Sequence, residues 1–359
     1  MAKVKNKNKK KKTKLKKLPI IIILILLILG GGLFTYLKFF DKDGKVKKEI
    51  KEEITNIIEK KEEVDIIDLD SNVRNVAVMI NNHPNARPYH AGLSDAFVIY
   101  EMLVEGGFTR YLAVYNDQDT AKIGSVRSSR HYFLDYALEH DAIYVHWGWS
   151  PQAQSDIRSL GIKNINGLTY EGVYFFRDRT LKTALEHTGF TDMEKINKAI
   201  GKLGYSTTTE KETLLNYSVE DEDLSKMEGA IVANNVAIPY SNSTNTSYVY
   251  DVENKVYKRF VNNKEHVDHV TGEQYTFKNI ISYKVGSRVI DNYGRLDLSN
   301  VGSGEGYYIT NGYAIPIKWE KTTRKSQTRY YYSDGTELKV SDGNTFIQIQ
   351  PTNKTLTLS

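Results

Sequence analysis

The segment 18–37 limits the fold of this chain more than any other. It holds twenty uncharged, mostly apolar residues, and at about 1.5 Å per residue a helix of that length spans roughly 30 Å, one bilayer core. Ten lysines and no acidic residue precede it, and such positive charge stays on the cytoplasmic side. We therefore expect a cytoplasmic tail at 1–17, a single-pass transmembrane anchor at 18–40, and folded domains outside the cell membrane.

A cleaved secretory signal is the alternative, because it also begins with a positive region followed by an apolar core. No cleavage site of the A-x-A type follows, and the apolar run continues to Phe40 with only Lys38 intervening. We favour a retained anchor, and both interpretations place the folded part outside. Residues 41–72 are charge-dense and carry a narrow apolar stripe from Val46 to Ile58, which predicts a solvated helical stalk.

Composition excludes several classes of site and partner. The chain has no cysteine, which excludes disulfides, thiolate metal sites, a cysteine nucleophile and a lipidated N-terminal cysteine. The net charge is +5, and the first 40 residues contain eleven lysines and no acid, so residues 41–359 carry −6. An acidic exported part binds nucleic acid poorly, since neutralising phosphates requires a basic face. We expect no nucleic-acid partner, no metal and no cofactor.

Residues 73–205 predict an α/β domain. Short apolar runs at 75–80, 110–115 and 142–145 are typical of strands, and amphipathic helical patterns alternate with them. The run 96–104 is also apolar, with Glu101 inside it, and its pattern leaves helix and strand open. Capping residues predict where the helices begin and end. Ser128 or Ser129 is the expected N-cap of a helix that continues through Leu138. Ser150 and Pro151 are expected to begin a second helix, which Gly161 ends. Thr191 with Glu194 forms the capping box of a third.

Residues 206–230 are polar and acidic, which suggests a linker. In 231–359, β-forming segments alternate with hairpin signals at Asp334-Gly335 and Asp342-Gly343. The GSGEG run at 302–306 lacks the helix and lysine of a phosphate loop, and we expect a turn there. The expected fold class is an α/β (α+β) N-terminal domain plus a mainly-β C-terminal domain, preceded by one transmembrane helix and a helical stalk.

Several long motifs of the chain point to one known family. They include VAVMINNHPNARPYHAGLSDAFVIYEMLVEGGFTRYLAVY, IGSVRSSRHYFLDYA and DAIYVHWGWSP in the first half, and VGSGEGYYITNGYAIPIKWEK in the second. These motifs resemble the YerB-like family of bacterial envelope proteins, which are frequently lipoproteins. The resemblance covers about residues 73–358 and implies an exported two-domain protein, without established catalytic residues. Two features depart from the family: the usual lipobox cysteine is absent, and Glu186-His187-Thr188 stands where relatives tend to have Pro-His-Asn. The second departure leaves the role of His187 open.

The GSVRSSR turn at 124–130 is the first ligand-site candidate. A cation in the first turn of a helix opposes the macrodipole, so Arg130 there favours a nearby anion. Arg127 and Arg130, with Ser128 and Ser129, would bind a phosphate, sulfate or carboxylate. The alternative is a structural network in which an acidic side chain of the protein pairs with these arginines; the candidates for it are Glu101, Glu105 and Asp178.

The HWGWSP turn at 146–151 is the second candidate. It follows a predicted strand, and ligands of α/β sheets collect beyond the carboxyl ends of strands. Trp147 and Trp149 could stack on sugar rings, and His146 could act as a general acid or base. The alternative is that all three side chains pack the domain.

Three further groups are weaker candidates. A loop rich in Asn, Pro and His could border the same cleft. Two glutamates four residues apart would suit glycosidase chemistry if they were not ion-paired, and an HVDH run lacks a third well-spaced metal ligand and fits a hairpin edge better. The loop contributes His83, Arg87 and His90. The two glutamates are Glu101 and Glu105, and the HVDH run contains His266, Asp268 and His269.

These patterns predict a membrane-anchored extracytoplasmic binding or scaffold protein of the bacterial envelope, whose partner is a cell-wall glycan, an anionic ligand or an envelope protein. The alternative is a cell-wall-active hydrolase or transferase that uses His146 with Arg127 and Arg130, and Glu101 is a second catalytic candidate. No nucleophile elbow or zinc motif supports catalysis, so the sequence leaves the enzymatic question open. The expected ligand-binding residues are Arg87, Arg127, Ser128, Ser129, Arg130, His146 and Trp149.

Overall fold

The computed structural model describes residues 63–359, which form one compact unit. The predicted tail, the anchor at 18–40 and most of the stalk lie outside these residues. Within the described part, no helix is both long and apolar enough to cross a bilayer. The described chain is mostly strand with few helices, which is consistent with the expected α/β and β classes.

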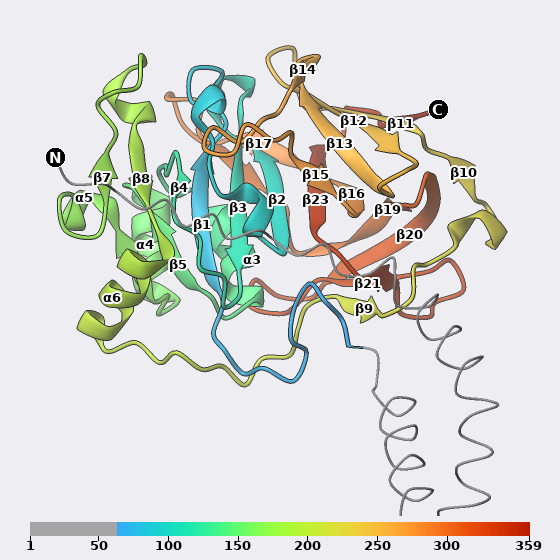
Figure 1. Ribbon diagram of the computed structural model, residues 1–359, viewed down its shortest axis with the longest axis horizontal. Helices are drawn as coiled ribbons and strands as arrows, with labels where there is room; N and C mark the ends of the chain where they lie inside the picture. Colours follow the sequence, from blue (N-terminus) through green and yellow to red (C-terminus); the bar gives the residue numbers. More distant parts are fainter. Residues whose placement is uncertain (1–62) are drawn as a thin grey trace, which may run out of the picture. The chain divides into compact units, whose positions relative to one another are not determined.

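A single eleven-stranded sheet contains strands from both halves of the sequence (Figure 1). Its order is β10-β20-β19-β16-β23-β2-β3-β1-β5-β6, with β21 paired to β20. The halves join where β2 and β23 pair in parallel, with Val98 opposite Thr345. The strand bounds are β1 Val76–Asn81, β2 Val98–Leu103, β3 Thr109–Tyr115, β5 Ile143–His146, β6 Asn164–Asn166, β10 Ile231–Val232, β16 Asn279–Val285, β19 Gly302–Thr310, β20 Tyr313–Lys321, β21 Arg329–Tyr331 and β23 Thr345–Pro351.

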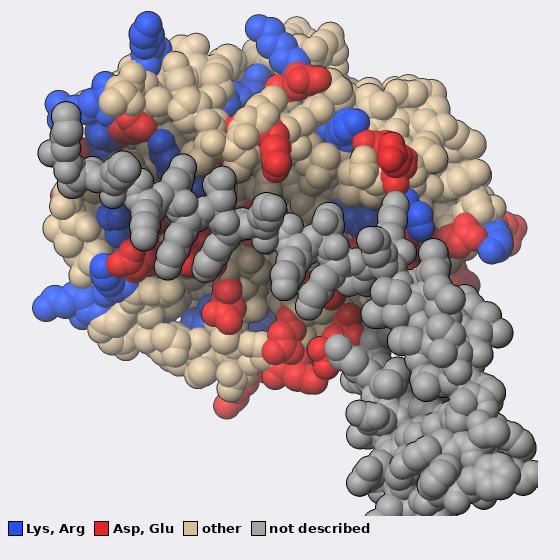
Figure 2. All heavy atoms as spheres, viewed as in Figure 1, with Lys and Arg blue, Asp and Glu red and all other residues tan. Residues whose placement is uncertain are grey.

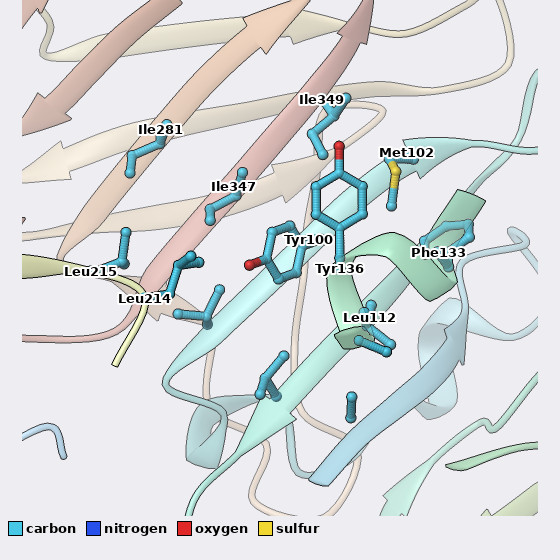
Figure 3. Packing of buried hydrophobic residues seen from close by; sticks show 14 of the residues in the cluster. Tyr100, Met102, Leu112, Phe133, Tyr136, Leu214, Leu215, Ile281, Ile347 and Ile349 are labelled. Carbon is cyan, nitrogen blue, oxygen red and sulfur yellow. The ribbon is translucent and has the colours of Figure 1, made fainter. Parts of the chain in front are cut away.

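Two layers cover the faces of this sheet. One face packs against the short helix α3 (Leu134–Glu139), and Figure 3 shows Tyr136 of this helix beside Tyr100 of β2, whose register partner in β23 is Ile347. The other face packs against α6 (Met193–Leu203) and a second, six-stranded sheet. The strands of that second sheet are β11 Asn235–Pro239, β12 Asn245–Asp251, β13 Val256–Val261, β14 Lys264–Glu265, β15 Thr276–Phe277 and β24 Thr357–Leu358.

The acidic stretch 206–230 is packed against the protein. Its strand β9 (Asn216–Ser218) pairs in parallel with β22 (Lys339–Ser341), and Leu214, Leu215 and Leu224 are buried. The stretch 206–230 therefore separates two segments of the sequence but not two separate sheets. Strands of 73–205 and of 231–359 form one shared sheet.

The predicted helix caps were partly wrong. Ser150 does cap α4 (Pro151–Ser159), and its hydroxyl accepts from the amide of Ala153. Neither Ser128 nor Ser129 caps a helix, because extended backbone continues to Arg130 and a short 3₁₀ turn, His131–Phe133, precedes α3. Arg130 therefore stands before the helical region, and the dipole argument for an anion loses its basis.

The cap of α6 is Asp192, whose carboxylate accepts from the amide of Lys195. Thr191, the predicted cap, donates its hydroxyl to the carbonyl of Tyr174 instead. An aspartate immediately after the threonine competes for the same role, and both residue types are good caps.

The GSGEG run is the start of β19, so the predicted turn was wrong there too. A Cβ on Gly304 would lie 2.9 Å from Trp319 Nε1, and one on Gly306 would lie 2.5 Å from the carbonyl oxygen of Ser282. Close packing of the strands explains these two glycines without a phosphate. Asp342-Gly343 joins β22 to β23, which pair with other strands, so it makes no hairpin.

Candidate functional site: an arginine–tryptophan cleft

The carboxyl ends of three strands meet at one edge of the central sheet. This follows because β5 runs parallel to β1, and β6 runs parallel to β5. Both predicted turns lie at this edge, where backbone bridges join Val126 to Ile80 and Ser129 to Trp149. It is the edge at which ligands of open α/β sheets bind.

A cavity of about 350 Å³ opens beside the two turns. Its wall combines two guanidinium groups, two indole rings, an exposed leucine and one carboxylate. A larger cavity of about 520 Å³ is lined by Arg74 and Lys163 among others, but contains none of the predicted site residues. The smaller cavity, called the arginine–tryptophan cleft below, is lined by Val126, Arg127, Ser128, Trp147, Gly148, Trp149, Leu168, Arg177 and Glu186.

The two arginines of the cleft differ in how firmly they are held. The side chain of Arg127 is 25% exposed, and its Nη2 lies 3.4 Å from Glu186 Oε1, longer than an ordinary charged hydrogen bond. Arg177 donates from Nε to Glu171 at 3.0 Å, and its guanidinium lies 4.2 Å from the centroid of the Trp147 ring, a cation–π contact. Arg127 is therefore the cation more available to a ligand.

The two tryptophans have different roles. Trp147 is buried, and a Cβ on Gly167 or Gly189 would come within 2.5 or 2.7 Å of its ring, so the indole fills its slot. Trp149 is half-buried and borders the cleft. Stacking on a sugar ring is therefore open to Trp149, while Trp147 forms the wall behind it.

His146 lies beneath the cleft and is fully buried. Its Nδ1 lies 2.8 Å from the carbonyl oxygen of Gly148, and its Nε2 lies 3.1 Å from Asn164 Oδ1. Burial lowers the pKa of His146, because the charged imidazolium is poorly solvated there. With both ring nitrogens engaged, His146 holds the turn in shape and has no free nitrogen for exchanging a proton with a ligand.

The serines of the GSVRSSR turn also bond inward. Ser128 donates its hydroxyl to the carbonyl of Trp147 at 3.0 Å, and Ser129 accepts from the hydroxyl of Tyr144 at 2.7 Å. The amides of Arg127 and Ser129 donate to Met79 and Gly148. Of the anion-binding groups expected in this turn, Arg127 and Ser128 line the cleft, and the Ser128 hydroxyl is already used in its bond to Trp147.

Arg130 is neutralised by the protein itself, as in the structural alternative. It donates to both carboxylate oxygens of Glu105, at 2.5 and 2.9 Å. Although burial favours the neutral acid, these bonds hold the pKa of Glu105 below its usual value. The neighbouring Arg110 is buried and donates to the carbonyl of Ser128; burial, with Arg130 close by, lowers the pKa of Arg110 to about 9.

A polar cluster of histidines adjoins the cleft. The rings of His83 and His187 stack with centroids 4.8 Å apart. His187 Nδ1 lies 2.9 Å from Asn81 Nδ2, and its Nε2 lies 3.5 Å from Glu186 Oε1. Arg87 is close by but donates to the side chain and the carbonyl of Asn82, so it supports the loop.

Glu101, the second catalytic candidate, lies in the core. Arg259 of β13 donates to its carboxylate at 2.8 Å, and neither side chain is exposed. Thr109 and Thr246 donate to the same carboxylate at 2.7 and 3.1 Å. A buried carboxylate with this many donors is a structural link between the halves of the chain, and none of its side chain is exposed to solvent.

The link continues through two histidines. Arg259 donates to His266 Nδ1 at 2.6 Å, His266 Nε2 lies 2.7 Å from His90 Nδ1, and His90 Nε2 bonds to the carbonyl of Asn81. Burial lowers the pKa of His90 to about 3 and that of His266 well below its usual value. Neutral rings that each donate from Nε2 satisfy every bond in this chain.

The HVDH run contains no metal site. Asp268 accepts from the hydroxyl of Tyr275 and the amide of Gly92, both at 2.8 Å, while the ring of His269 packs edge-on against Tyr89. Among the described residues, no group of three His, Cys, Asp or Glu side chains is arranged to hold a metal ion.

Three residues of the cleft were not predicted from the sequence: Leu168, Arg177 and Glu186. Arg177 lies in β7 (Phe176–Arg177), where it is opposite Gly189 of β8 (Gly189–Thr191). The one available signal was the departure from the family pattern at Glu186-His187, since both of these residues lie at the cleft or next to it.

Comparison with known proteins reveals the relatives of this chain. Residues 64–206 match the family model described as the N-terminal domain of the protein of unknown function DUF3048, and residues 236–347 match its C-terminal domain. The chain is 34% identical over 281 residues to "Putative lipoprotein YerB" of Bacillus subtilis strain 168, covering 77% of this chain and 81% of that protein. It also resembles the crystal structure of the Bacillus subtilis YerB protein, with a TM-score of 0.70, 31% identity, and coverage of 80% of this chain and 94% of that one.

Proposed function

Since the chain belongs to the DUF3048 family and the resemblance to YerB is confirmed over most of its length, we propose that it is a membrane-anchored extracytoplasmic protein of the bacterial cell envelope. Its arginine–tryptophan cleft binds an anionic, sugar-containing envelope ligand. The protein acts as a binding module, and the ligand enters at the carboxyl edge of β1 and β5.

The anchoring half of the proposal is supported by the relative and by composition. The relative is named as a lipoprotein, whose lipid is carried on an N-terminal cysteine. This chain contains no cysteine, so the apolar segment 18–40 takes the place of the lipid, and the lysines before it stay in the cytoplasm.

The binding half rests on one observation: a half-buried indole and an incompletely paired guanidinium share one cleft. Trp149 supplies an aromatic face for a sugar, and Arg127 supplies charge for a carboxylate or phosphate. Figure 2 shows Lys and Arg side chains gathered at the left end, where Figure 1 places β7, β8 and α5 (Gly167–Tyr170). Residues 151–205 contain eight Lys or Arg and six Asp or Glu, although 41–359 carry −6 overall.

Incubation of the purified full chain with cell-wall fragments tests this function. We expect the fragments to be retained without being cleaved, and retention to fall at least about tenfold in Trp149→Ala. Release of soluble products would instead support the hydrolase or transferase. If the fragments are neither retained nor cleaved, the result contradicts a glycan ligand. An envelope protein then remains as the partner.

A further inference from the structure

Two hydrogen-bond donors converge on one point at the edge of the cleft. Arg127 Nη2 lies 3.4 Å from Glu186 Oε1, and His187 Nε2 lies 3.5 Å from the same oxygen. The two donors come from distant segments, the GSVRSSR turn and the loop between β7 and β8. An oxygen atom that lies between a guanidinium and an imidazole N–H is in an anion-binding position.

The protonation of His187 follows from its neighbours. The amide of His83 donates to Asn81 Oδ1 at 3.1 Å, which directs Asn81 Nδ2 towards His187 Nδ1 at 2.9 Å. Because Nδ2 is a donor, His187 Nδ1 must accept, and the ring hydrogen of the neutral form lies on Nε2. Burial lowers the pKa of His187, although Glu186 opposes the effect. The ring is thus a neutral donor whose Nε2 lies 3.5 Å from Glu186 Oε1.

The carboxylate that fills this position is held weakly. Glu186 is 56% exposed, and both of its contacts exceed 3.3 Å. The firm arginine pairs of the same molecule are shorter: 2.5 Å for Arg130 with Glu105, and 2.8 Å for Arg259 with Glu101. An exposed pair with such long contacts contributes little to stability, so a ligand oxyanion can replace it at small cost.

We propose that Arg127 and His187 form an oxyanion-binding site in which the Glu186 carboxylate is an internal substitute that the ligand displaces. The site takes a carboxylate or phosphate oxygen of a ligand whose sugar ring stacks on Trp149. This rests on the proposed function and deepens it: Glu186 selects for ligands whose anion binds tightly enough to displace it.

The experiment compares wild type with Glu186→Gln, using Glu194→Gln as the matched control. Glu194 is also an exposed glutamate that pairs with one cation, Lys198, but it lies on α6 outside the cleft. The full chain in detergent is titrated with inorganic phosphate, glucuronate and glucose, and indole fluorescence is read out because two of the three tryptophans line the cleft.

We expect Glu186→Gln to bind glucuronate or phosphate about five- to tenfold more tightly than wild type, Glu194→Gln to match wild type, and glucose binding to be unchanged by either. The tighter of the two anions identifies the carboxylate or the phosphate as the preferred group. The ring ¹⁵N signal of His187, assigned by its loss in His187→Phe, should shift when the anion binds to wild type.

The proposed oxyanion site is wrong if Glu186→Gln binds the anions with an affinity within twofold of wild type and the His187 signal does not move. If glucuronate binding nevertheless depends on Trp149, the proposed function survives and only this inference fails. If neither wild type nor Glu186→Gln binds any probe, both fail.

Discussion

Two arginine–glutamate pairs of this protein lie in contrasting surroundings. Arg259 and Glu101 are wholly buried, 2.8 Å apart, and bonded to further side chains. Arg127 and Glu186 are 3.4 Å apart, with 25% and 56% of their side chains exposed. The same two chemical groups thus form a structural link in one place and an exchangeable contact in the other.

The difference shows what decides the role of a charge. In the core, a charge that lost its partner would remain without solvation, so the pair must stay closed. At the cleft, water solvates both groups, so separating the pair costs little, and we propose that an external anion displaces Glu186. Burial and geometry, rather than residue type, separate the two pairs.

The largest expected effect is on the buried pair. Arg259→Met leaves Glu101 charged and unpaired in the core, and we expect it to lower the free energy of unfolding by about 3–5 kcal/mol. Arg127→Met, the matched change at the cleft, should cost less than about 1 kcal/mol. Urea unfolding measures both, and equal losses would remove the contrast between the pairs.

The histidines of the buried link make stability depend on pH. His90, whose pKa is lowered to about 3, and His266 stay neutral in the folded protein, whereas in the unfolded chain they bind protons below about pH 6.5. Stability from this source is therefore full above pH 6.5 and is lost as the pH falls towards 3, by up to about 1.4 kcal/mol per pH unit for each histidine.

His90→Gln keeps a side chain that can accept and donate but does not titrate. Its unfolding free energy should fall less steeply than that of wild type between pH 6.5 and pH 4.5. Parallel curves for the two proteins would mean that the buried histidines do not cause the acid sensitivity.

At the cleft, Trp149→Ala should reduce the affinity for cell-wall fragments about tenfold or more, because the stacking face is lost. Tyr293→Ala removes an aromatic ring that is 80% exposed and lies outside the cleft, and should leave binding unchanged. Sedimentation of the protein with the fragments measures both. An equal effect of the two changes would indicate non-specific adsorption.

The smallest expected effect is the coupling between Arg127 and Glu186. A double-mutant cycle with Arg127→Met and Glu186→Gln should give an interaction free energy below about 0.5 kcal/mol by urea unfolding. A coupling above about 1.5 kcal/mol would show that this pair is structural and that Glu186 is not readily displaced.

Local features of the fold were predictable from the sequence. Ser150 caps its helix as expected, because capping depends on residues within one turn of each other. The strands near 75–80 and 142–145 were recognisable as apolar runs. The positions of these strands in the sequence indicated which edge of the sheet carries the cleft. Arg127, Ser128 and Trp149, which were expected at that edge, line the cleft.

Long-range pairing could not be predicted in the same way. Glu101 and Arg259 are 158 positions apart, and the pairing of β2 with β23 brings the first and last parts of the described chain together. Such contacts depend on the whole topology. The sequence offered Glu105 as one of three acidic partners for these arginines, but it could not show that Glu105 is the one that neutralises Arg130. It gave no sign that the loop after β7 brings Glu186 to Arg127.

The most direct test of the account is the binding of an anionic sugar by two arginine variants of the full chain. Indole fluorescence is titrated with a glucuronate-bearing disaccharide for wild type, Arg127→Met, and Arg177→Met as a second cleft arginine. The account predicts saturable binding to wild type that Arg127→Met abolishes while its unfolding free energy stays within about 1 kcal/mol of wild type, with a smaller loss in Arg177→Met. Unchanged affinity in a folded Arg127→Met would contradict the central claim that this cleft binds its ligand through Arg127.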